Sequence, residues 1–341
     1  MRILYGVCGE GFGHSSRAGK VIEHLLKKGN EVLVVTYGQA YDVLKKYPVV
    51  RVPGLKMVFE KGRLSTRKTI IDNLKEFLKD YKPFLNLKRR VEKFEPEICI
   101  TDMEPLVPII SNWYKIPLIS FDNQHRITHL KLNVPRKYAK DYLLAKGVVN
   151  RVVSRAEAFI ILSFAKQKTT GGVFVVEPLL REEIIKLKPE KGKKILVYQS
   201  RVNEDLIGVL RKIPEEFVVY GYEKEKKEGN LVFKKFGEGF LKDLSTAKAI
   251  IGTAGFSLMS EAVYLKKPYF AIPLRGQFEQ VLNSLFWKKS GFGEYSEIPS
   301  EAEIKFFLGR LKKYESKLRK NKINPGEALE VLDGALRKIG K

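Results

Sequence analysis

The chain has 341 residues, 44% of them hydrophobic and 30% charged, and its 63 Lys and Arg against 39 Asp and Glu give a formal net charge of +24. This length exceeds one ordinary core and predicts two domains of about 150 residues each. No apolar run approaches the roughly 18 residues that a membrane-spanning helix needs, which argues against an integral membrane protein. The only two cysteines, Cys8 and Cys99, lie in apolar runs, so we expect free thiols in a reducing compartment.

The excess of positive charge predicts an anionic partner: nucleic acid, an anionic membrane or a phosphorylated ligand. The Lys- and Glu-rich composition is also typical of thermophiles. Met1 leads directly into an apolar stretch without a small-residue cleavage site behind it. We therefore expect no cleaved signal peptide and a cytoplasmic protein.

Apolar runs and turn signals predict alternating strands and helices in the first half of the chain. We expect strands at residues 2–8, 31–36, 97–101, 117–121, 158–163 and 173–176. We expect helices at residues 14–28, 38–46 and 105–113, and one or two amphipathic helices within 65–94 that break at Pro83. The order of strand, loop, helix and strand predicts a parallel, doubly wound α/β sheet.

A polar, Lys- and Glu-rich stretch at 177–192 predicts a linker between domains at 1–176 and 193–320. The alternation then restarts, with expected strands at 194–199, 217–221, 231–234, 249–252 and 269–272. Expected helices lie at 204–212, 240–247 and 257–264, begin at 280 and 301, and end the chain at 324–339. Two doubly wound, Rossmann-like domains joined in this way predict a ligand cleft between them, facing the carboxyl ends of the strands.

A glycine-rich loop, G-E-G-F-G-H at residues 9–14, follows the first expected strand. Its spacing lacks the G-x-G-x-x-G pattern of dinucleotide-binding proteins, and no acidic residue ends the second strand, which disfavours a nicotinamide site. His14 stands at the start of the first helix, and a neutral imidazole there suits a general base. A purely structural histidine is the alternative.

Polar side chains follow two further strands of the first half. Asp102 ends the strand at 97–101, where it could hold the ring of His14 or serve as a helix N-cap ahead of Pro105. Asp122-Asn123-Gln124-His125-Arg126 follows the strand at 117–121. Carboxyl ends of parallel strands meet at one edge, so we expect both groups beside the cleft.

Two segments of the second half carry binding chemistry. Gly252-Thr253-Ala254-Gly255-Phe256-Ser257 joins a strand to a helix, and the amides of 255–257 are expected to bind an anion such as a diphosphate. Glu261 lies one turn further along, where a carboxylate can accept two hydrogen bonds from a ribose diol. Glu279 and Gln280 open another helix after a strand, a position suited to binding sugar hydroxyls.

Taken together, the G-x-G-H loop, T-A-G-x-S-x-x-x-E at 253–261 and E-Q-x-x-N at 279–283 resemble the two-domain GT-B glycosyltransferases. Among them, the chain resembles the group of the muramyl-lipid GlcNAc transferase and the diacylglycerol galactosyltransferases, over almost its whole length. Glu177-Pro178-Leu179-Leu180-Arg181 is similar to the start of that family's linker. The resemblance implies a first domain that binds the acceptor, a second that binds the nucleotide sugar, and a final segment, 321–341, that packs back on the first.

The resemblance also implies roles for individual residues. His14 is the base and Asp102 its acidic partner; Gly11, Gly13, Gln124, His125 and Arg126 bind the acceptor; and Ser200, Gly255, Phe256, Ser257, Glu261, Glu279 and Gln280 bind the donor. Some positions depart from the family pattern, since Gln199-Ser200-Arg201 replaces a glycine-rich loop and Glu279 replaces the commoner Asp.

The implied reaction is an inverting transfer from a nucleotide diphosphate sugar, such as a UDP-sugar, to a hydroxyl of a lipid-linked or glycan acceptor. It needs no cofactor and no obligatory metal, since helix dipoles and Arg275 could offset the charge of the leaving group. The stretch 126–155 holds eight basic residues and one acidic residue, and is either a solvated surface or a patch that binds an anionic membrane at its inner face. A nucleotide-sugar 2-epimerase and a non-catalytic nucleic-acid-binding protein are the alternatives, but no recognisable nucleic-acid-binding module is present, so no nucleic-acid partner is expected.

Overall fold

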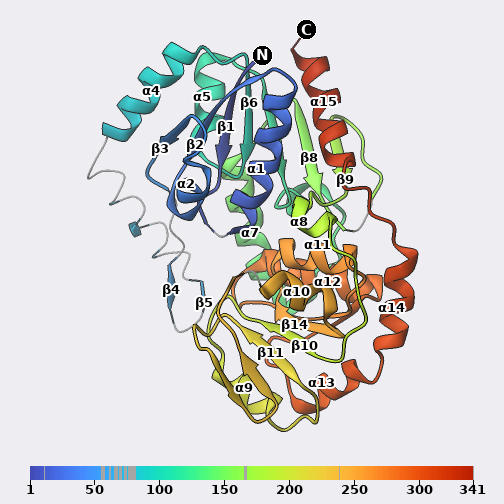
Figure 1. Ribbon diagram of the computed structural model, residues 1–341. Coiled ribbons are helices and arrows are strands. Elements are labelled where there is room, and N and C mark those ends of the chain that lie inside the picture. Colours follow the sequence, from blue (N-terminus) through green and yellow to red (C-terminus); the bar gives the residue numbers. More distant parts are fainter. Residues whose placement is uncertain are drawn as a thin grey trace. The chain divides into compact units, whose positions relative to one another are not determined.

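The chain folds into two compact units, each with its own sheet and its own hydrophobic core (Figure 1). The computed structural model describes residues 1–10, 12–54, 58–60, 63–64, 68, 71–72, 75, 82–164, 167–237 and 239–340. The first unit comprises Met1–Arg181 and Asn324–Lys341, and the second comprises Glu182–Ile323. The chain therefore leaves the first unit once and returns to it at the end.

The first unit is built on a seven-stranded parallel sheet in the order β3-β2-β1-β6-β7-β8-β9. Its strands are β1 (Arg2–Val7), β2 (Glu31–Thr36), β3 (Val49–Arg51), β6 (Ile98–Asp102), β7 (Leu118–Asp122), β8 (Ala158–Leu162) and β9 (Val173–Val176). The central strands are rich in Val, Ile and Leu and are buried along their length, as expected where helices cover both faces of a parallel sheet. A separate antiparallel pair is formed by β4 (Phe59–Glu60) and β5 (Arg63–Leu64).

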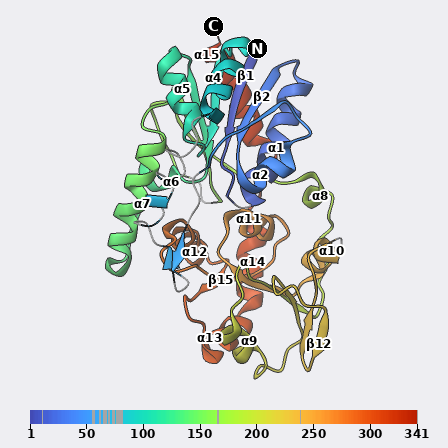
Figure 2. The same cartoon turned by 90° about the vertical axis from the view of Figure 1, so that its left-hand side faces the viewer.

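Helices lie on both faces of this sheet, with α1 and α5 on opposite sides in Figure 2. The helices of the first unit are α1 (Phe12–Lys27), α2 (Gly38–Leu44), α4 (Lys82–Phe94), α5 (Leu106–Tyr114), α6 (Arg126–His129), the 3₁₀ turn η1 (Arg136–Tyr138), α7 (Ala139–Val152) and α15 (Glu327–Ile339). The terminal helix α15 packs against β8 and β9. His24 on α1 bonds to Asp333 on α15 through Nε2 and Oδ1 at 2.8 Å, which ties the returning segment to the rest of the unit.

The second unit is also built on a seven-stranded sheet, in the order β12-β13-β11-β10-β14-β15-β16. Its strands are β10 (Ile195–Tyr198), β11 (Phe217–Tyr220), β12 (Lys226–Glu228), β13 (Leu231–Phe233), β14 (Ala249–Thr253), β15 (Tyr269–Ile272) and β16 (Gly293–Tyr295). All neighbours pair in parallel except β12 and β13, which are antiparallel. The helices are α8 (Glu182–Ile185), α9 (Glu204–Leu210), α10 (Gly239–Thr246), α11 (Phe256–Tyr264), α12 (Phe278–Ser290), α13 (Glu301–Leu308) and α14 (Leu311–Lys320).

The predicted fold class is confirmed, since both sheets are doubly wound. Pro83, the predicted break, lies in the first turn of α4, which begins at Lys82; there a missing backbone N–H costs nothing and the fixed φ angle suits the helix. Most of the helix predicted before it, residues 65–81, lies outside the described residues. The stretch expected to be a linker contains α8, and the boundary between the units falls after Arg181.

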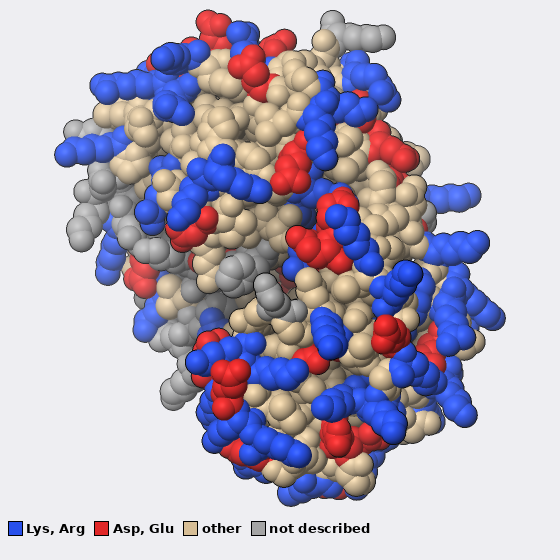
Figure 3. Space-filling view, in the orientation of Figure 1, with Lys and Arg blue, Asp and Glu red and all other residues tan. Residues whose placement is uncertain are grey.

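No helix in the described parts of the chain is long and apolar enough to cross a membrane. On the face shown in Figure 3, Lys and Arg side chains are spread over both units and alternate with Asp and Glu. The net charge of +24 is therefore not gathered into one patch on this face.

Candidate active site

The sheet of the first unit reverses its strand order between β1 and β6, and the residues at the ends of these two strands meet there. Val7, the last residue of β1, is in register with Asp102, the last residue of β6. Ligands of doubly wound folds bind at such a switch point, outside the carboxyl ends of the strands. The loop after β1 leads into α1 and carries His14 in its first turn. Gly9 is needed in this loop because a Cβ would lie 2.2 Å from the carbonyl oxygen of Tyr37.

His14 and Asp102 are hydrogen-bonded in the structure. Nδ1 of His14 lies 2.8 Å from Oδ1 of Asp102, and the carboxylate is completely buried whereas 14% of the His14 side chain is exposed. The pair thus has one buried partner and one that reaches solvent, as a base and the group that orients it require. The sequence predicted that Asp102 could hold the ring of His14, and the structure shows the two side chains in contact.

Arg17, which the sequence analysis did not single out, completes this arrangement. It lies three residues after His14, on the same face of α1. Its Nε donates to Oδ2 of Asp102 at 2.6 Å, its Nη2 also donates to Oδ1, and its Nη1 donates to Oδ1 of Asn123 at 2.7 Å. Burial by itself opposes the charged form of Asp102, but the interactions with Arg17 and His14 outweigh it and hold the pKa of this carboxyl below its usual value.

The hydrogen bonds around the imidazole define its tautomer. Oε1 of Gln124 accepts from the backbone N–H of Asn123 at 3.2 Å, so the other end of this amide is the NH₂ group, which lies 3.2 Å from Nε2 of His14. An NH₂ group only donates, so Nε2 must be an acceptor and the ring proton must be on Nδ1, which donates it to Asp102. With the proton on Nδ1, this nitrogen and Nη2 of Arg17 are both donors and lie 2.8 Å apart. They are this close because both bond to Oδ1 of Asp102. In this tautomer, Nε2 of a neutral His14 carries the electron pair that accepts from Gln124.

The end of β7 and the turn after it form a second, fully buried cluster. Nδ1 of His125 lies 2.7 Å from Oδ2 of Asp122, and the hydroxyl of Ser120 donates to the same oxygen at 2.6 Å. Burial opposes a charge on His125, but Asp122 raises its pKa above the ordinary value. Nε of Arg126 donates to the carbonyl oxygen of Asn123 at 2.7 Å. This cluster holds the turn that presents Asn123 and Gln124.

The predicted acceptor-binding residues therefore differ in their accessibility. His125 and Arg126 are completely buried in this unit, Gln124 is buried but contacts His14, and Gly13 lies in the first turn of α1. Gly11 lies outside the described residues. Acceptor binding by these residues stays a prediction. Because Gln124 contacts His14, it is the best placed of them to reach an acceptor that binds beside His14.

In the second unit, the strand order reverses between β10 and β14, and the predicted donor residues gather there. The backbone N–H of Ser200, just after β10, donates to Oγ1 of Thr253, the last residue of β14, at 3.0 Å. The amide of Gly255 bonds to the carbonyl oxygen of Thr253 at 2.7 Å, so it is engaged within the loop. A Cβ at Gly255 would meet nothing within 4 Å, which leaves the N-terminus of α11 open on that side. Ser257 lies in its first turn, where backbone N–H groups have no helical acceptor.

Glu261, Glu279 and Gln280 also belong to this part of the second unit. Glu261 is buried on α11, and Glu279 lies in the partly exposed first turn of α12. Oε1 of Gln280 accepts from the backbone N–H of Leu274 at 3.0 Å, which braces the loop before α12. Asn283, noted only as part of a motif, donates from Nδ2 to the carbonyl oxygen of Ala254 at 2.9 Å and ties α12 to the β14–α11 loop.

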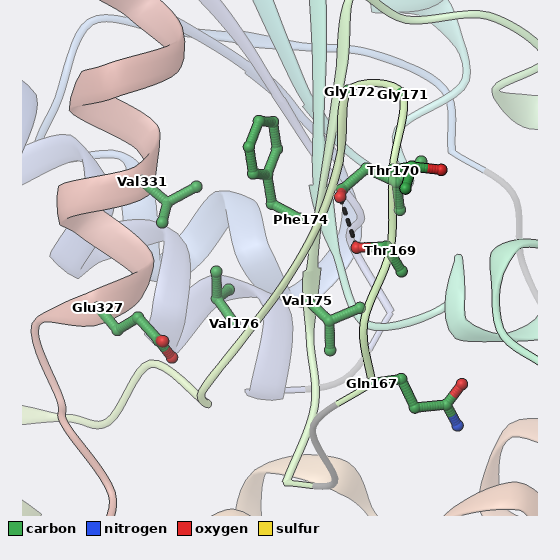
Figure 4. Close-up of a pocket in the computed structure, with 11 residues that line it drawn as sticks. Gln167, Thr169, Thr170, Gly171, Gly172, Phe174, Val175, Val176, Glu327 and Val331 are labelled. Carbon is green, nitrogen blue, oxygen red and sulfur yellow. Dashed lines mark hydrogen bonds between the residues drawn. The ribbon is translucent and has the colours of Figure 1, made fainter.

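A hollow of about 310 Å³ lies elsewhere in the first unit, between the segment 167–176 and α15 (Figure 4). Phe174, Val176 and Val331 line it together with Glu327 and the turn at Gly171 and Gly172. None of the predicted site residues is among its lining residues. The candidate active site is therefore defined by hydrogen bonding at the strand ends and not by this hollow.

Residues 1–312 match the model of glycosyl transferase family 1, and the chain belongs to this family. It is a glycosyltransferase with the GT-B fold, a class of enzyme that uses nucleotide sugar donors. An uncharacterized glycosyltransferase of Methanosarcina acetivorans is 24% identical over 98% of this chain and 95% of its own. A Bacillus cereus UDP-N-acetylglucosamine–N-acetylmuramyl-(pentapeptide) pyrophosphoryl-undecaprenol N-acetylglucosamine transferase is 33% identical over 20% of each chain. Among solved structures, a UDP-glucosyltransferase of Polygonum tinctorium matches with a TM-score of 0.70 and 15% identity, covering 100% of this chain and 98% of that one.

Proposed function

We propose that this protein is an inverting glycosyltransferase in which His14 deprotonates an acceptor hydroxyl that then attacks the anomeric carbon of a nucleotide diphosphate sugar. The observation that carries the proposal is the contact of Nδ1 of His14 with the buried carboxylate of Asp102, because a ring that donates from Nδ1 accepts a proton at Nε2. A base with this arrangement takes a proton at Nε2 while the carboxylate stabilises the imidazolium.

The chemical step follows from this geometry. The acceptor O–H transfers its proton to Nε2, the oxygen forms a bond to the anomeric carbon, and the bond from that carbon to the diphosphate oxygen breaks with both electrons leaving on the diphosphate. Attack from the side opposite the leaving group inverts the anomeric configuration. The amide NH₂ of Gln124 lies 3.2 Å from Nε2, so a hydroxyl that donates to Nε2 could accept from Gln124 and be held by both.

The donor diphosphate is assigned to the N-terminus of α11, with Ser200, Phe256 and Ser257 around it. The open side of Gly255 and the positive end of the helix dipole at the start of α11 suit an anion. Glu261 would accept from the ribose hydroxyls, and Glu279 and Gln280 from the sugar. The helix dipole and Arg275 would offset the charge of the leaving group, so we propose that no metal is obligatory. A uridine nucleotide is supported by the Polygonum protein, whose name identifies it as a UDP-glucosyltransferase.

The acceptor is proposed to be lipid-linked, so that the enzyme acts at an anionic membrane surface. The name of the Bacillus cereus relative specifies an undecaprenol-linked acceptor. In this protein, Leu143, Leu144 and Val148 on α7 are 65%, 43% and 47% exposed, and the exposed Lys140 and Arg151 flank them. Exposed apolar side chains among basic ones suit the interface of an anionic bilayer. This combination, rather than charge alone, distinguishes α7, the helix labelled in Figure 2.

The proposal is tested by separating donor binding from chemistry. Calorimetry with UDP and with several UDP-sugars should detect binding, and His14→Gln should keep the same affinity because the donor residues belong to the other unit. Release of UDP during turnover should fall by about 10²–10⁴-fold in this variant. His24→Gln, on the same helix, is the control and should retain turnover. A His14→Gln enzyme with more than a tenth of the wild-type rate would remove His14 as the base.

A further inference from the structure

We propose that Arg17 is a positioning residue of this glycosyltransferase: it aims the carboxylate of Asp102 at His14 and offsets the negative charge of that carboxylate beside the ring. The inference deepens the proposed function, because it presupposes that His14 is the base. Neither the family match nor the relatives assign a role to this residue. It is carried by the contacts that the guanidinium makes with three different elements of the first unit.

The guanidinium fixes the carboxylate in one orientation. Nε bonds to Oδ2 and Nη2 to Oδ1 of Asp102, a two-pronged contact that prevents rotation of the carboxylate about its own axis. Nη1 reaches across to Oδ1 of Asn123, which precedes Gln124. One side chain thus places both groups that contact the imidazole, Asp102 at Nδ1 and Gln124 at Nε2. A lysine could supply the charge but not this planar fork.

The same contacts set the charge of the site. Asp102 and Arg17 together are neutral, so protonation of His14 creates a net positive charge in a nearly closed site. In the familiar histidine–carboxylate pair, by contrast, the carboxylate is uncompensated and favours the protonated ring. Arg17 offsets that effect from a distance of 2.8 Å between Nη2 and Nδ1. The orienting bond of Asp102 is kept while its pull on the proton is reduced.

Other described titratable groups near this site do not replace Arg17 in that role. Tyr5 on β1 is completely buried, and its pKa is raised well above the ordinary value, chiefly by burial and then by Asp102, so it stays neutral. Asp122 at the end of β7 is paired with His125. Burial opposes its charge, but His125 holds its pKa below the usual value. Asp102 on β6 and Arg17 on α1 are therefore the charges that contact the ring.

The test is an NMR titration of the ligand-free protein labelled with ¹³C and ¹⁵N histidine, whose four histidines are distinguished with His14→Gln. The ring ¹⁵N shifts of the neutral wild type should show the proton on Nδ1. In Arg17→Gln the midpoint of the His14 titration should move up by about 1–3 pH units, the effect expected when a like charge in contact is removed. Lys27→Gln, which removes a charge from the exposed last turn of α1, should leave it unchanged.

Arg17→Lys separates charge from geometry and covers the case in which Arg17→Gln does not fold. It should leave the midpoint within about half a pH unit of wild type but lower the turnover rate at least tenfold, since the fork is lost. An unshifted midpoint in a folded Arg17→Gln protein, or full turnover in Arg17→Lys, would overturn the inference. If His14→Gln remains active while the midpoint in Arg17→Gln shifts as expected, the effect of the Arg17 charge is supported and His14 is not the base. If His14→Gln is inactive but the midpoint in Arg17→Gln is unshifted, only the proposed role of Arg17 is refuted.

Discussion

Asp102→Asn is the substitution that separates the two tasks of this carboxylate. Asp102 offers two oxygens, and the structure uses both: Oδ2 accepts from Nε of Arg17 at 2.6 Å, and Oδ1 accepts from Nη2 of Arg17 and from Nδ1 of His14. An asparagine keeps one oxygen and replaces the other by an NH₂ group. In either orientation of the amide, a donor then faces a donor. When the NH₂ group faces Nδ1, it also forces the ring proton onto Nε2 and removes the base.

The expected magnitudes follow from burial. The variant leaves the charge of Arg17 uncompensated in a nearly closed site, which should lower the free energy of unfolding by about 3–5 kcal/mol. For a unit of this size each kcal/mol corresponds to roughly 2–4 °C in melting temperature. Turnover should fall by about 10²–10⁴-fold while the affinity for UDP is unchanged. The double variant Asp102→Asn with Arg17→Gln restores neutrality, so it should regain stability but not turnover. A single variant that melts within 2 °C of wild type would refute the buried ion pair on which the reasoning depends.

Three further predictions concern other parts of the molecule. Glu261→Ala should weaken UDP binding by about 1.5–3 kcal/mol in calorimetry and leave the fold intact; equal affinity would remove this residue from the donor site. Burial raises the pKa of Glu104 to about 7, so the folded state binds the extra proton between pH 4.5 and 7 and stability is lost as pH rises through this window. Glu104→Gln should remove that loss, up to about 3 kcal/mol, in denaturant unfolding at pH 5 and pH 8; an unchanged pH dependence would contradict the assignment. Replacing Arg136, Lys137 and Lys140 by Glu should abolish sedimentation with anionic vesicles. Equal binding of the wild type to anionic and neutral vesicles would argue against an electrostatic surface.

The strands that position the site could be predicted closely from the sequence. Runs of Val, Ile and Leu bounded by polar residues located β1, β6, β7, β14 and β15 to within about two residues, because strands buried on both faces allow little else. Helix α7 was missed. It contains Gly147 followed by two β-branched valines, and its exposed leucines break the expected apolar stripe, so no helical periodicity distinguishes it.

Contacts across long stretches of chain were predictable in part. His14 and Asp102 could be paired because both follow strands of a parallel sheet. The contact of Arg17 with Asp102 could not be predicted, since a single arginine in a basic protein gives no sign that it is buried. A spacing of three residues from His14, in a helix that opens with small residues, is the signal that could have found it. The buried state of His125 and Arg126 depends on how the turn after β7 packs, and no local pattern encodes that.

The two switch points end in residues of different charge. In the first unit, β6 lies across the switch point from β1 and ends in Asp102, a charged residue bonded to Arg17. In the second, the equivalent strand β14 ends in Thr253, a neutral residue that bonds to the backbone of Ser200. A carboxylate at this second position would repel a diphosphate bound at α11, whereas a hydroxyl does not. If the donor binds at α11 as proposed, we therefore expect its binding to require a neutral end of β14.

Thr253→Asp tests this requirement, with Thr253→Asn as a neutral control of nearly the same size. At a separation of about 6 Å and an effective dielectric constant of about 20, one added negative charge acting on the diphosphate costs about 3 kcal/mol, or roughly a hundredfold in affinity. Calorimetry with UDP should therefore show binding by Thr253→Asn that is much tighter than binding by Thr253→Asp. Melting temperatures check that both variants fold, since Thr253 is buried. Equal affinities in two folded variants would place the diphosphate away from the end of β14.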